Sequence, residues 1–249
     1  MSEHPLRAIV TGGANGIGQA VADRLAGDGA LVAVADRDAE AGARWLEAHA
    51  AAGREVAVHT VDCSDPEAPA QVVAAVTAAW GGLDLLVNNA AVSRYEHVLD
   101  ITPASWNEVI GVNLSAYFFW AQAAARQMAV AGRGRIVNMA SVNSLAAEPG
   151  AAHYVASKGG VAALTRALAV DLARLGITVN AVAPGPVVTE RNAHLLATEP
   201  LATQVGRVPV GHAARPADVA ALVSWLAAPD AEYVNGAVIV IDGGLLARI

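Results

Sequence analysis

A tyrosine and a lysine, four residues apart, are the pair in this chain best suited to chemistry. Tyr154 and Lys158 are preceded by Ser141, thirteen positions before the tyrosine, and by Asn113 farther back. Residues four apart on a helix share one face. A tyrosine hydroxyl has a pKa of about 10, and a nearby ammonium favours the phenolate and moves that pKa toward the range of effective acid–base catalysis. A serine hydroxyl at the same point holds a carbonyl or alkoxide oxygen. Many helices carry such a pair by chance, so its weight depends on the rest of the chain.

The elements that must position these residues alternate along the chain. Helical patterns cover residues 16–29, a segment ending near 52, 65–80, 103–130, 153–175 and 216–227. Apolar runs that predict strands cover residues 6–11, 30–35, 56–61, 83–87, 135–139, 177–183 and 237–241. Nearly continuous apolar strands separated by helices are typical of a parallel sheet covered on both faces, and right-handed crossovers make it doubly wound. We therefore expect a Rossmann-type α/β fold with about seven strands.

Composition limits the possible functions. No linker, repeat or composition shift divides the 249 residues, so residues 1–249 are expected to form a single domain. The formal net charge of -7 argues against a nucleic-acid partner, because binding phosphates needs clustered Lys and Arg. The N-terminus lacks a signal pattern, and no apolar run reaches the ~20 residues that span a bilayer. With Cys63 as its one cysteine, the chain can form no internal disulfide. We expect a cytoplasmic protein with no membrane partner, and no cluster of residues has the spacing of metal ligands.

A glycine-rich turn, Thr11–Gly18, follows the first predicted strand and opens the first predicted helix. Glycines allow a tight turn and close approach to a pyrophosphate, which rests on the helix N-terminus. Asp36 ends the second strand, where its carboxylate is placed to accept hydrogen bonds from an adenosine ribose and to repel a 2′-phosphate. The residue before Gly16 is Asn15, which is not basic. These features favour NAD, while Arg37 keeps NADP as the alternative.

Polar or small residues also end the next two strands. Asp62 is placed to bind an adenine amino group, and Asp65 is expected to cap the following helix before Pro66. The small residues of Asn88–Ala91 allow close approach to a cofactor. Ligands of open α/β sheets bind at the carboxyl ends of the strands, so these segments should converge on one crevice.

Together these motifs resemble the short-chain dehydrogenase/reductase family of the classical type. The resemblance extends over the whole chain, and it rests on the pattern Thr11-Gly-x-x-x-Gly16-x-Gly18, Asp62, Asn88-Asn89-Ala90, Asn113, Ser141, Tyr154-x-x-x-Lys158 and Pro184-Gly185. Ala91 departs from it, because the family usually has glycine there. This small change affects the geometry of the cofactor more than activity.

The resemblance implies a role for each residue of the catalytic set. Tyr154 would be the acid in reduction and the base in oxidation, and Ser141 would hold the substrate oxygen. Lys158 would bind the nicotinamide ribose and lower the pKa of Tyr154, while Asn113 would hold a water that links Lys158 to solvent. The predicted cofactor-binding residues are Gly12, Asn15, Gly16, Ile17, Gly18, Asp36, Arg37, Asp62, Cys63, Asn89, Ala90, Ala91, Tyr154, Lys158, Pro184, Gly185, Val187 and Thr189.

The substrate is less well defined by the sequence. A moderately polar mixture of residues is expected near Tyr154, and it suits a polyol, a sugar, a small hydroxy-ketone or a cyclic alcohol. The candidates are Ser93, Tyr95, Ser141, Asn143, Leu145, His153, Tyr154, Gly185, Val187, Val188, His194 and Leu195. A packing or surface role is the alternative for both histidines. Residues 186–210 are predicted to form a short substrate lid.

Assembly and two rival functions complete the expectations. Residues Tyr117–Trp120 form an apolar run that a monomer would find hard to bury, and the resemblance implies a homotetramer built through the long helices and the C-terminal strand. The main interpretation is an NAD-dependent oxidoreductase of a small secondary alcohol. The rivals are an NADPH-dependent 3-oxoacyl-carrier-protein reductase and a non-catalytic dinucleotide-binding sensor.

Overall fold

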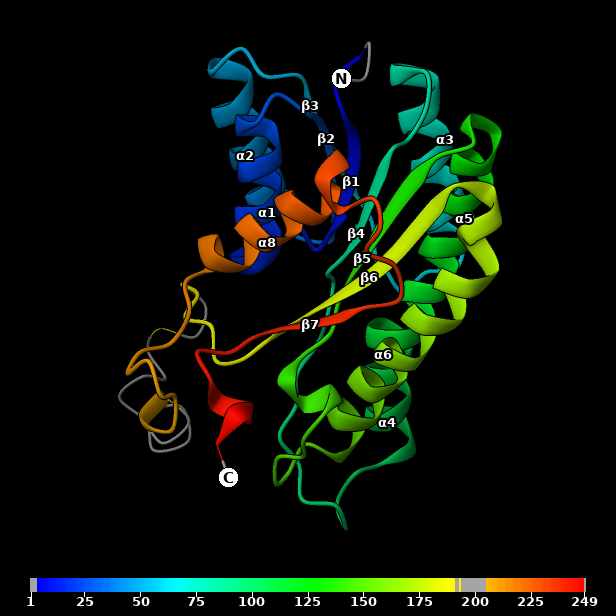
Figure 1. Ribbon diagram of the computed structural model, residues 1–249. Coiled ribbons are helices and arrows are strands. Elements are labelled where there is room, and N and C mark those ends of the chain that lie inside the picture. The colour runs from blue at the N-terminus through cyan, green and yellow to red at the C-terminus, as the bar shows by residue number, and fades with distance from the viewer. Residues whose placement is uncertain (1–3, 191–192, 194–204, 249) are drawn as a thin grey trace.

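The computed structural model describes residues 4–190, 193 and 205–248, which form a parallel sheet between two layers of helices (Figure 1). The strand order is β3-β2-β1-β4-β5-β6-β7, and every pairing is parallel. The strands are β1 Arg7–Thr11, β2 Leu31–Asp36, β3 Val56–Thr60, β4 Leu85–Asn88, β5 Gly134–Met139, β6 Ile177–Pro184 and β7 Val238–Ile241. The chain winds outward in both directions from the boundary between β1 and β4, where open α/β sheets bind their ligands. The predicted seven-stranded fold is confirmed.

Helices cover both faces of the sheet (Figure 1). One face carries α1 Gly16–Gly27, α2 Ala39–Ala51 and α8 Pro216–Ala227. The other carries α3 Ala68–Trp80, α4 Pro103–Ile110, α5 Ala116–Ala131 and α6 Ala152–Leu172. Short 3₁₀ turns lie at Val142–Ser144, Ala173–Leu175, Pro229–Ala231 and Leu245–Ala247. None of the helices within the described ranges is long and apolar enough to cross a membrane.

Alternation along the strands divides the core into two apolar layers. On β1, Ala8 and Val10 pack in the layer under α1, α2 and α8, while Ile9 packs in the layer under α3 and α5. All five residues of β1 are buried. A strand buried on both faces needs apolar side chains at every position, which explains why the strands were recognisable as unbroken apolar runs.

The predicted helix 103–130 is not uniform. Between α4 and α5, residues Gly111–Ser115 form a π-helical segment that carries Asn113. Such segments insert an extra residue into a helix and are frequent at functional sites. The sequence did not reveal this interruption, because it depends on what Asn113 contacts rather than on helix propensity.

Two further expectations were wrong in detail. The third helix begins at Ala68, not at residue 65, and Asp65 instead accepts a hydrogen bond from the backbone N–H of Glu67 in the preceding turn. In the aromatic run on α5, Tyr117 and Trp120 are buried, while Phe118 and Phe119 are 38% and 41% exposed. The helix directs residues three apart inward together, so half of the predicted apolar patch belongs to the core.

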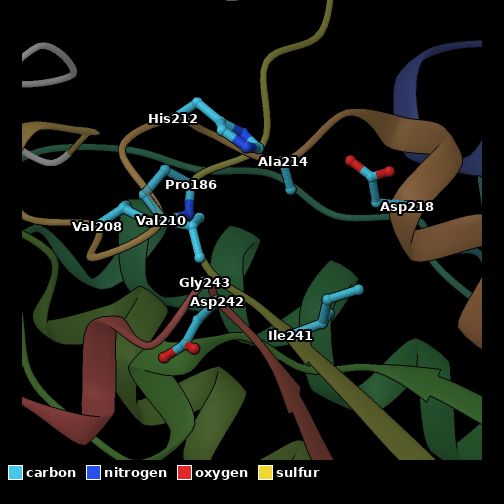
Figure 2. A pocket seen from close by; sticks show the side chains of 9 residues that line it. All are labelled: Pro186, Val208, Val210, His212, Ala214, Asp218, Ile241, Asp242 and Gly243. Atoms are coloured by element: carbon cyan, nitrogen blue, oxygen red, sulfur yellow. The ribbon is translucent and has the colours of Figure 1, made fainter.

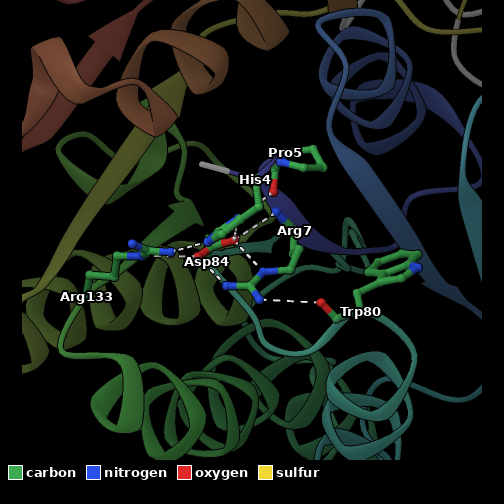
Figure 3. Close-up of polar contacts among 6 residues, drawn as sticks. All are labelled: His4, Pro5, Arg7, Trp80, Asp84 and Arg133. Atoms are coloured by element: carbon green, nitrogen blue, oxygen red, sulfur yellow. Dashed lines mark hydrogen bonds and ion pairs between the residues drawn. The ribbon is translucent and has the colours of Figure 1, made fainter. Parts of the chain in front are cut away.

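A cluster of ion pairs lies at the end of the sheet where β1 begins (Figure 3). The Arg7 guanidinium donates to both oxygens of Asp84, at 2.7 and 2.9 Å, and the Arg7 backbone N–H donates to the same carboxylate at 3.1 Å. Arg133 Nε lies 3.5 Å from Asp84, and Arg133 also bonds His4. The cluster joins β1 to the loops that lead into β4 and β5.

Candidate active site

The glycine-rich turn is held in place from the end of β4. The Asn89 side-chain amide donates to the carbonyl oxygens of Thr11 and Gly12, at 3.0 Å each. A Cβ on Gly18 would lie 2.0 Å from the Gly12 oxygen, and a Cβ on Gly12, whose φ is +62°, would lie 2.8 Å from the Ala90 Cα. Only glycine fits at these two positions. The predicted cofactor residues of this turn therefore lie together, with the α1 N-terminus behind them.

Carboxylates surround the position predicted for the adenosine ribose. Asp36 accepts hydrogen bonds from the backbone N–H groups of Ala14 and Asp38, both at 3.0 Å. Asp38, which the sequence analysis missed, is the N-cap of α2, and it also accepts a hydrogen bond from Asn15 Nδ2 at 3.2 Å. Asp38 could have been recognised from the sequence as a second carboxylate, two residues after Asp36 and at the start of a predicted helix. The two charges make this end of the turn acidic.

The predicted adenine-side residues are placed differently from one another. Hydrogen bonds from the side chain and the backbone of Ser64 lower the pKa of Asp62, and the Arg37 charge lowers it further. Arg37 therefore makes the smallest of these contributions to the pKa of Asp62. The Cys63 thiol points into the interior, donates to the Ala35 carbonyl, and has its pKa raised to about 12 by burial. The thiol thus packs in the interior behind the glycine-rich turn.

Tyr154, Ser141 and Lys158 come together from β5 and α6. Ser141 follows β5, where it caps the turn Val142–Ser144 and accepts a hydrogen bond from the Asn143 N–H at 3.1 Å. Burial raises the pKa of Tyr154 to about 12, and a hydrogen bond with Ser141 opposes that rise. The Lys158 Nζ lies 5.8 Å from the centre of the Tyr154 ring. The predicted tyrosine–serine–lysine group is therefore assembled in space.

The expectation that Lys158 lowers the pKa of Tyr154 does not hold for the protein alone. Burial lowers the pKa of Lys158 to about 7, and the same burial raises that of Tyr154. Desolvation disfavours the charged form of each group and is the largest cause of both shifts. The Lys158 ammonium donates instead to the Met139 carbonyl oxygen, at 2.7 Å.

Asn113 holds the loop that follows β4. Its side chain accepts from the Val92 N–H at 2.8 Å and donates to the Val92 carbonyl at 2.9 Å, and it reaches Ser157 at 3.3 Å. Among the described residues, its side-chain partners are thus Val92 and Ser157 rather than Lys158. A relay to Lys158 would need the bridging water that the family resemblance implies.

A polar group on the substrate side includes a residue that the sequence analysis missed. The Glu148 carboxylate accepts hydrogen bonds from the Tyr95 hydroxyl and the Asn143 amide, both at 3.3 Å. The charges of Tyr95 and Glu148 both act to raise the pKa of Tyr154. Glu148 could have been recognised from the sequence as an acidic residue between Ser141 and Tyr154. Ser93 and Leu145 are at least partly exposed in the neighbouring loops.

The substrate role predicted for His153 is wrong in this structure. The imidazole is fully buried, its Nδ1 accepts a hydrogen bond from the Tyr154 N–H, and its Nε2 lies 4.0 Å from the Glu96 carboxylate. A ring enclosed in this way packs beneath the site and does not face a substrate. The predicted substrate residues His194 and Leu195 lie outside the described residues, as do residues 191–192 and 194–204 of the predicted lid.

The segment after β6 crosses toward the glycine-rich turn. The Gly185 N–H donates to the Ile241 carbonyl at 2.9 Å, and the Val188 N–H donates to the Ala214 carbonyl at 3.0 Å. The Thr189 methyl group lies 3.4 Å from where a Cβ on Gly16 would stand. Of the predicted nicotinamide-side residues, Thr189 thus lies next to the glycine-rich turn.

A mostly apolar pocket lies beside this segment (Figure 2). Its lining residues are Pro186, Val208, Val210, His212, Ala214, Asp218, Ile241, Asp242 and Gly243. Figure 2 places the two carboxylates on opposite sides of the pocket, and both are already engaged, Asp242 by the N–H groups of Gly244 and Leu246 and Asp218 by Arg215. The pocket supports the segment and contains none of the acid–base residues. The described part of the chain holds no group of side chains suited to a metal ion.

Comparisons with known proteins cover nearly the whole chain. A family model described as enoyl-(acyl carrier protein) reductase matches residues 12–246. Gluconate 5-dehydrogenase of Gluconobacter oxydans is 36% identical over 96% of this chain and 94% of its own length. The 3-oxoacyl-[acyl-carrier-protein] reductase FabG of Vibrio cholerae is 34% identical over 96% of both chains. A solved gluconate 5-dehydrogenase from Burkholderia cenocepacia, in complex with NADP and tartrate, is 33% identical with a TM-score of 0.92, over 98% of this chain and 96% of that one.

Proposed function

Because the chain belongs to the short-chain dehydrogenase/reductase family, we propose that it is an NAD-dependent oxidoreductase that interconverts a small secondary alcohol and its ketone. Oxidoreduction of CH–OH groups is the activity of the family, and the chain has the residues for it. The observation that carries the proposal is that the Tyr154 hydroxyl bonds Ser141 and the Tyr154 ring lies 5.8 Å from Lys158 Nζ.

The residues of the chain divide the chemistry among them. A bound nicotinamide would supply the hydride acceptor for alcohol oxidation and the hydride donor for ketone reduction. Ser141 holds the substrate oxygen, and Tyr154 takes the hydroxyl proton in oxidation and returns it in reduction. Lys158 would donate to the nicotinamide ribose, and the N–H groups at the start of α1 would bind the pyrophosphate.

The preference for NAD rests on charge. Asp36 and Asp38 bring two carboxylates to one end of the turn, and both accept hydrogen bonds from residues of the turn. A 2′-phosphate would add a doubly charged anion next to these acids. The solved gluconate 5-dehydrogenase contains NADP, so the nucleotide must be tested directly.

The proposed substrates are small polyols, sugars, hydroxy-ketones or cyclic alcohols. Glu148, whose charge acts on Tyr154, and Asn143, which donates to Glu148, would supply hydrogen-bond acceptors and donors for additional hydroxyl groups. Similarity to a gluconate dehydrogenase supports a sugar-like substrate, while similarity to FabG supports the alternative, reduction of 3-oxoacyl groups on a carrier protein.

We also propose a homotetramer. Phe118 and Phe119 remain partly exposed on α5, and the residues of β7 are all partly or largely exposed at the sheet edge. Burying both surfaces between copies would remove apolar area from water. Sedimentation as a monomer at micromolar concentration would contradict this assembly.

One experiment separates these functions. The protein is assayed with a panel of polyols, sugars, cyclic alcohols and 3-oxoacyl thioesters, each with NAD(H) and NADP(H), by nicotinamide absorbance. We expect turnover of a neutral alcohol with NAD, and loss of turnover with retained NADH binding in Tyr154→Phe. Turnover of 3-oxoacyl thioesters with NADPH alone would support the reductase. Binding of NADH without turnover of any substrate would support the sensor.

A further inference from the structure

Tyr117 is a fully buried phenol to which the mechanism above gives no role. It lies on α5, four residues after Asn113, and only 1% of its surface is exposed. Burial raises its pKa well above the ordinary value for tyrosine, so it is a neutral phenol at pH 7. Its hydroxyl contacts Lys158 and the Met139 carbonyl rather than solvent.

The hydroxyl joins Lys158 to the end of β5. The Tyr117 hydroxyl donates to the Met139 carbonyl at 3.3 Å and accepts from Lys158 Nζ at 3.4 Å, while Nζ itself donates to the Met139 carbonyl at 2.7 Å. Nζ also lies 5.1 Å from the centre of the Tyr117 ring, within the range of a cation–π interaction. A phenol has one donor and two acceptor sites, so it can make both hydrogen bonds at once.

The surroundings of Lys158 otherwise favour the neutral amine. The titratable groups that face it are Tyr154 on its own helix and Tyr117 on α5, with Cys63 next to Tyr117. All three are neutral at pH 7. Among the described residues no carboxylate shifts its pKa, which burial lowers to about 7. The charged form of Lys158 is therefore stabilised by the Met139 carbonyl, the Tyr117 hydroxyl and the rings of Tyr117 and Tyr154.

We propose that Tyr117 is a positioning residue that holds the Lys158 ammonium against the Met139 carbonyl and keeps it charged for binding the nicotinamide ribose. The inference rests on the proposed function, which places Lys158 at that ribose. An apolar residue at position 117 would fill the same space but would remove a hydroxyl that accepts a hydrogen bond from Nζ.

The sequence allows a direct test, because Lys158 is the only lysine in the chain. Protein labelled with [ε-¹³C]lysine gives one side-chain NMR signal, whose pH titration reports the protonation of Lys158 without any cofactor. We expect the wild-type signal to titrate near pH 7 and that of Tyr117→Phe about one pH unit lower, a roughly tenfold loss of proton affinity. In parallel, NADH affinity measured by fluorescence should fall at a correspondingly lower pH in the variant.

Thr165→Val is the matched control. Thr165 is buried on α6 and its hydroxyl bonds the Val161 carbonyl and Asn138 Nδ2, not Lys158. We expect this variant to be destabilised but to keep the wild-type lysine titration. If Tyr117→Phe does not fold, Tyr117→Met fills the volume without a hydroxyl and makes the same prediction.

Two results overturn the proposal in different ways. Superimposable lysine titrations of the wild type and the Tyr117 variant would remove Tyr117 from the positioning of Lys158 and leave the proposed function intact. Failure of the wild-type protein to bind NADH at any pH would overturn the proposed function, and this inference with it.

Discussion

The carboxylate of Asp36 accepts a hydrogen bond from the backbone N–H of Ala14 at 3.0 Å. The end of β2 and the glycine-rich turn after β1 therefore form one surface, and its charge is negative. Asp38 extends that surface through its hydrogen bond from Asn15. Selection between the two nicotinamide dinucleotides should depend on these acids, because the nucleotides differ by one phosphate on the adenosine ribose.

Asp36→Ser should weaken the discrimination against NADP. Serine can still accept from the Ala14 N–H, but it removes the charge that repels the 2′-phosphate. We expect the ratio of kcat/KM for NAD to that for NADP to fall by about tenfold or more. The control is Glu40→Gln, which removes an exposed carboxylate in the first turn of α2 and should leave the ratio unchanged. An unchanged ratio in Asp36→Ser would assign the preference to other residues.

Glu148→Gln should change the pH dependence of catalysis. Burial raises the pKa of Tyr154 first of all, and the Glu148 charge raises it further. Alcohol oxidation needs the phenolate, so activity rises with pH through the pKa of Tyr154 in the complex. Removing the charge lowers that pKa, and the rising limb of kcat/KM should move to lower pH by roughly half a unit to one unit. Glu108→Gln, at an exposed ion pair with Arg94, should leave the limb in place.

Lys158→Met should abolish activity and yet stabilise the fold. Burial lowers the pKa of Lys158 from 10.5 when unfolded to about 7 when folded. The unfolded chain therefore binds more protons between these values, so wild-type stability rises with pH across that window. The variant lacks this cost, and its free energy of unfolding should exceed that of the wild type by several kcal/mol at pH 6. Urea unfolding at pH 6 and pH 10 measures the difference, which should shrink at the higher pH. A variant less stable than the wild type at pH 6 would contradict the lowered pKa.

Much of this arrangement was predictable from sequence, because its signals are local. Strands buried on both faces appear as apolar runs, and α8 begins and ends at the predicted residues. The glycine-rich turn was recognisable because Gly12 and Gly18 exclude every side chain. The tyrosine and lysine were recognisable from helical spacing.

What the sequence did not reveal depends on contacts between distant segments. The π-helical segment at Asn113 accompanies its two hydrogen bonds with Val92, twenty-one residues away. The sequence could not predict which aromatic residues of α5 face the core, because that helix is apolar on all sides. The opposite pKa shifts of Tyr154 and Lys158 follow from burial, which spacing does not report.

Gly18→Ala should remove cofactor binding. The added methyl group would lie 2.0 Å from the Gly12 oxygen and 2.4 Å from Asn89 Nδ2, so the turn must open. We expect loss of NADH binding in a fluorescence titration and a lower melting temperature. The matched control is Gly159→Ala on α6, where a Cβ meets nothing within 4 Å and the helix should gain up to about 1 kcal/mol. Wild-type NADH affinity in Gly18→Ala would show that the turn does not need this close packing.

Asp84→Asn should destabilise the fold without altering the site, because the cluster in Figure 3 lies at the opposite end of β1. Burial raises the pKa of Asp84, but the hydrogen bonds from Arg7 outweigh it and the net shift is downward. A carboxylate with a lowered pKa contributes stability that is complete above its unfolded pKa of about 3.9 and is lost as the pH falls through its folded value. We expect a loss of about 3 kcal/mol at pH 7, since a buried guanidinium is left without its charged partner. Denaturant unfolding at pH 7 and near pH 3 measures the loss, and the difference in free energy of unfolding between variant and wild type should narrow at the lower pH.

The control is Glu40→Gln, which breaks the exposed ion pair with Arg44 and should cost less than about 0.5 kcal/mol at either pH. An equal loss in the two variants would contradict the role of burial.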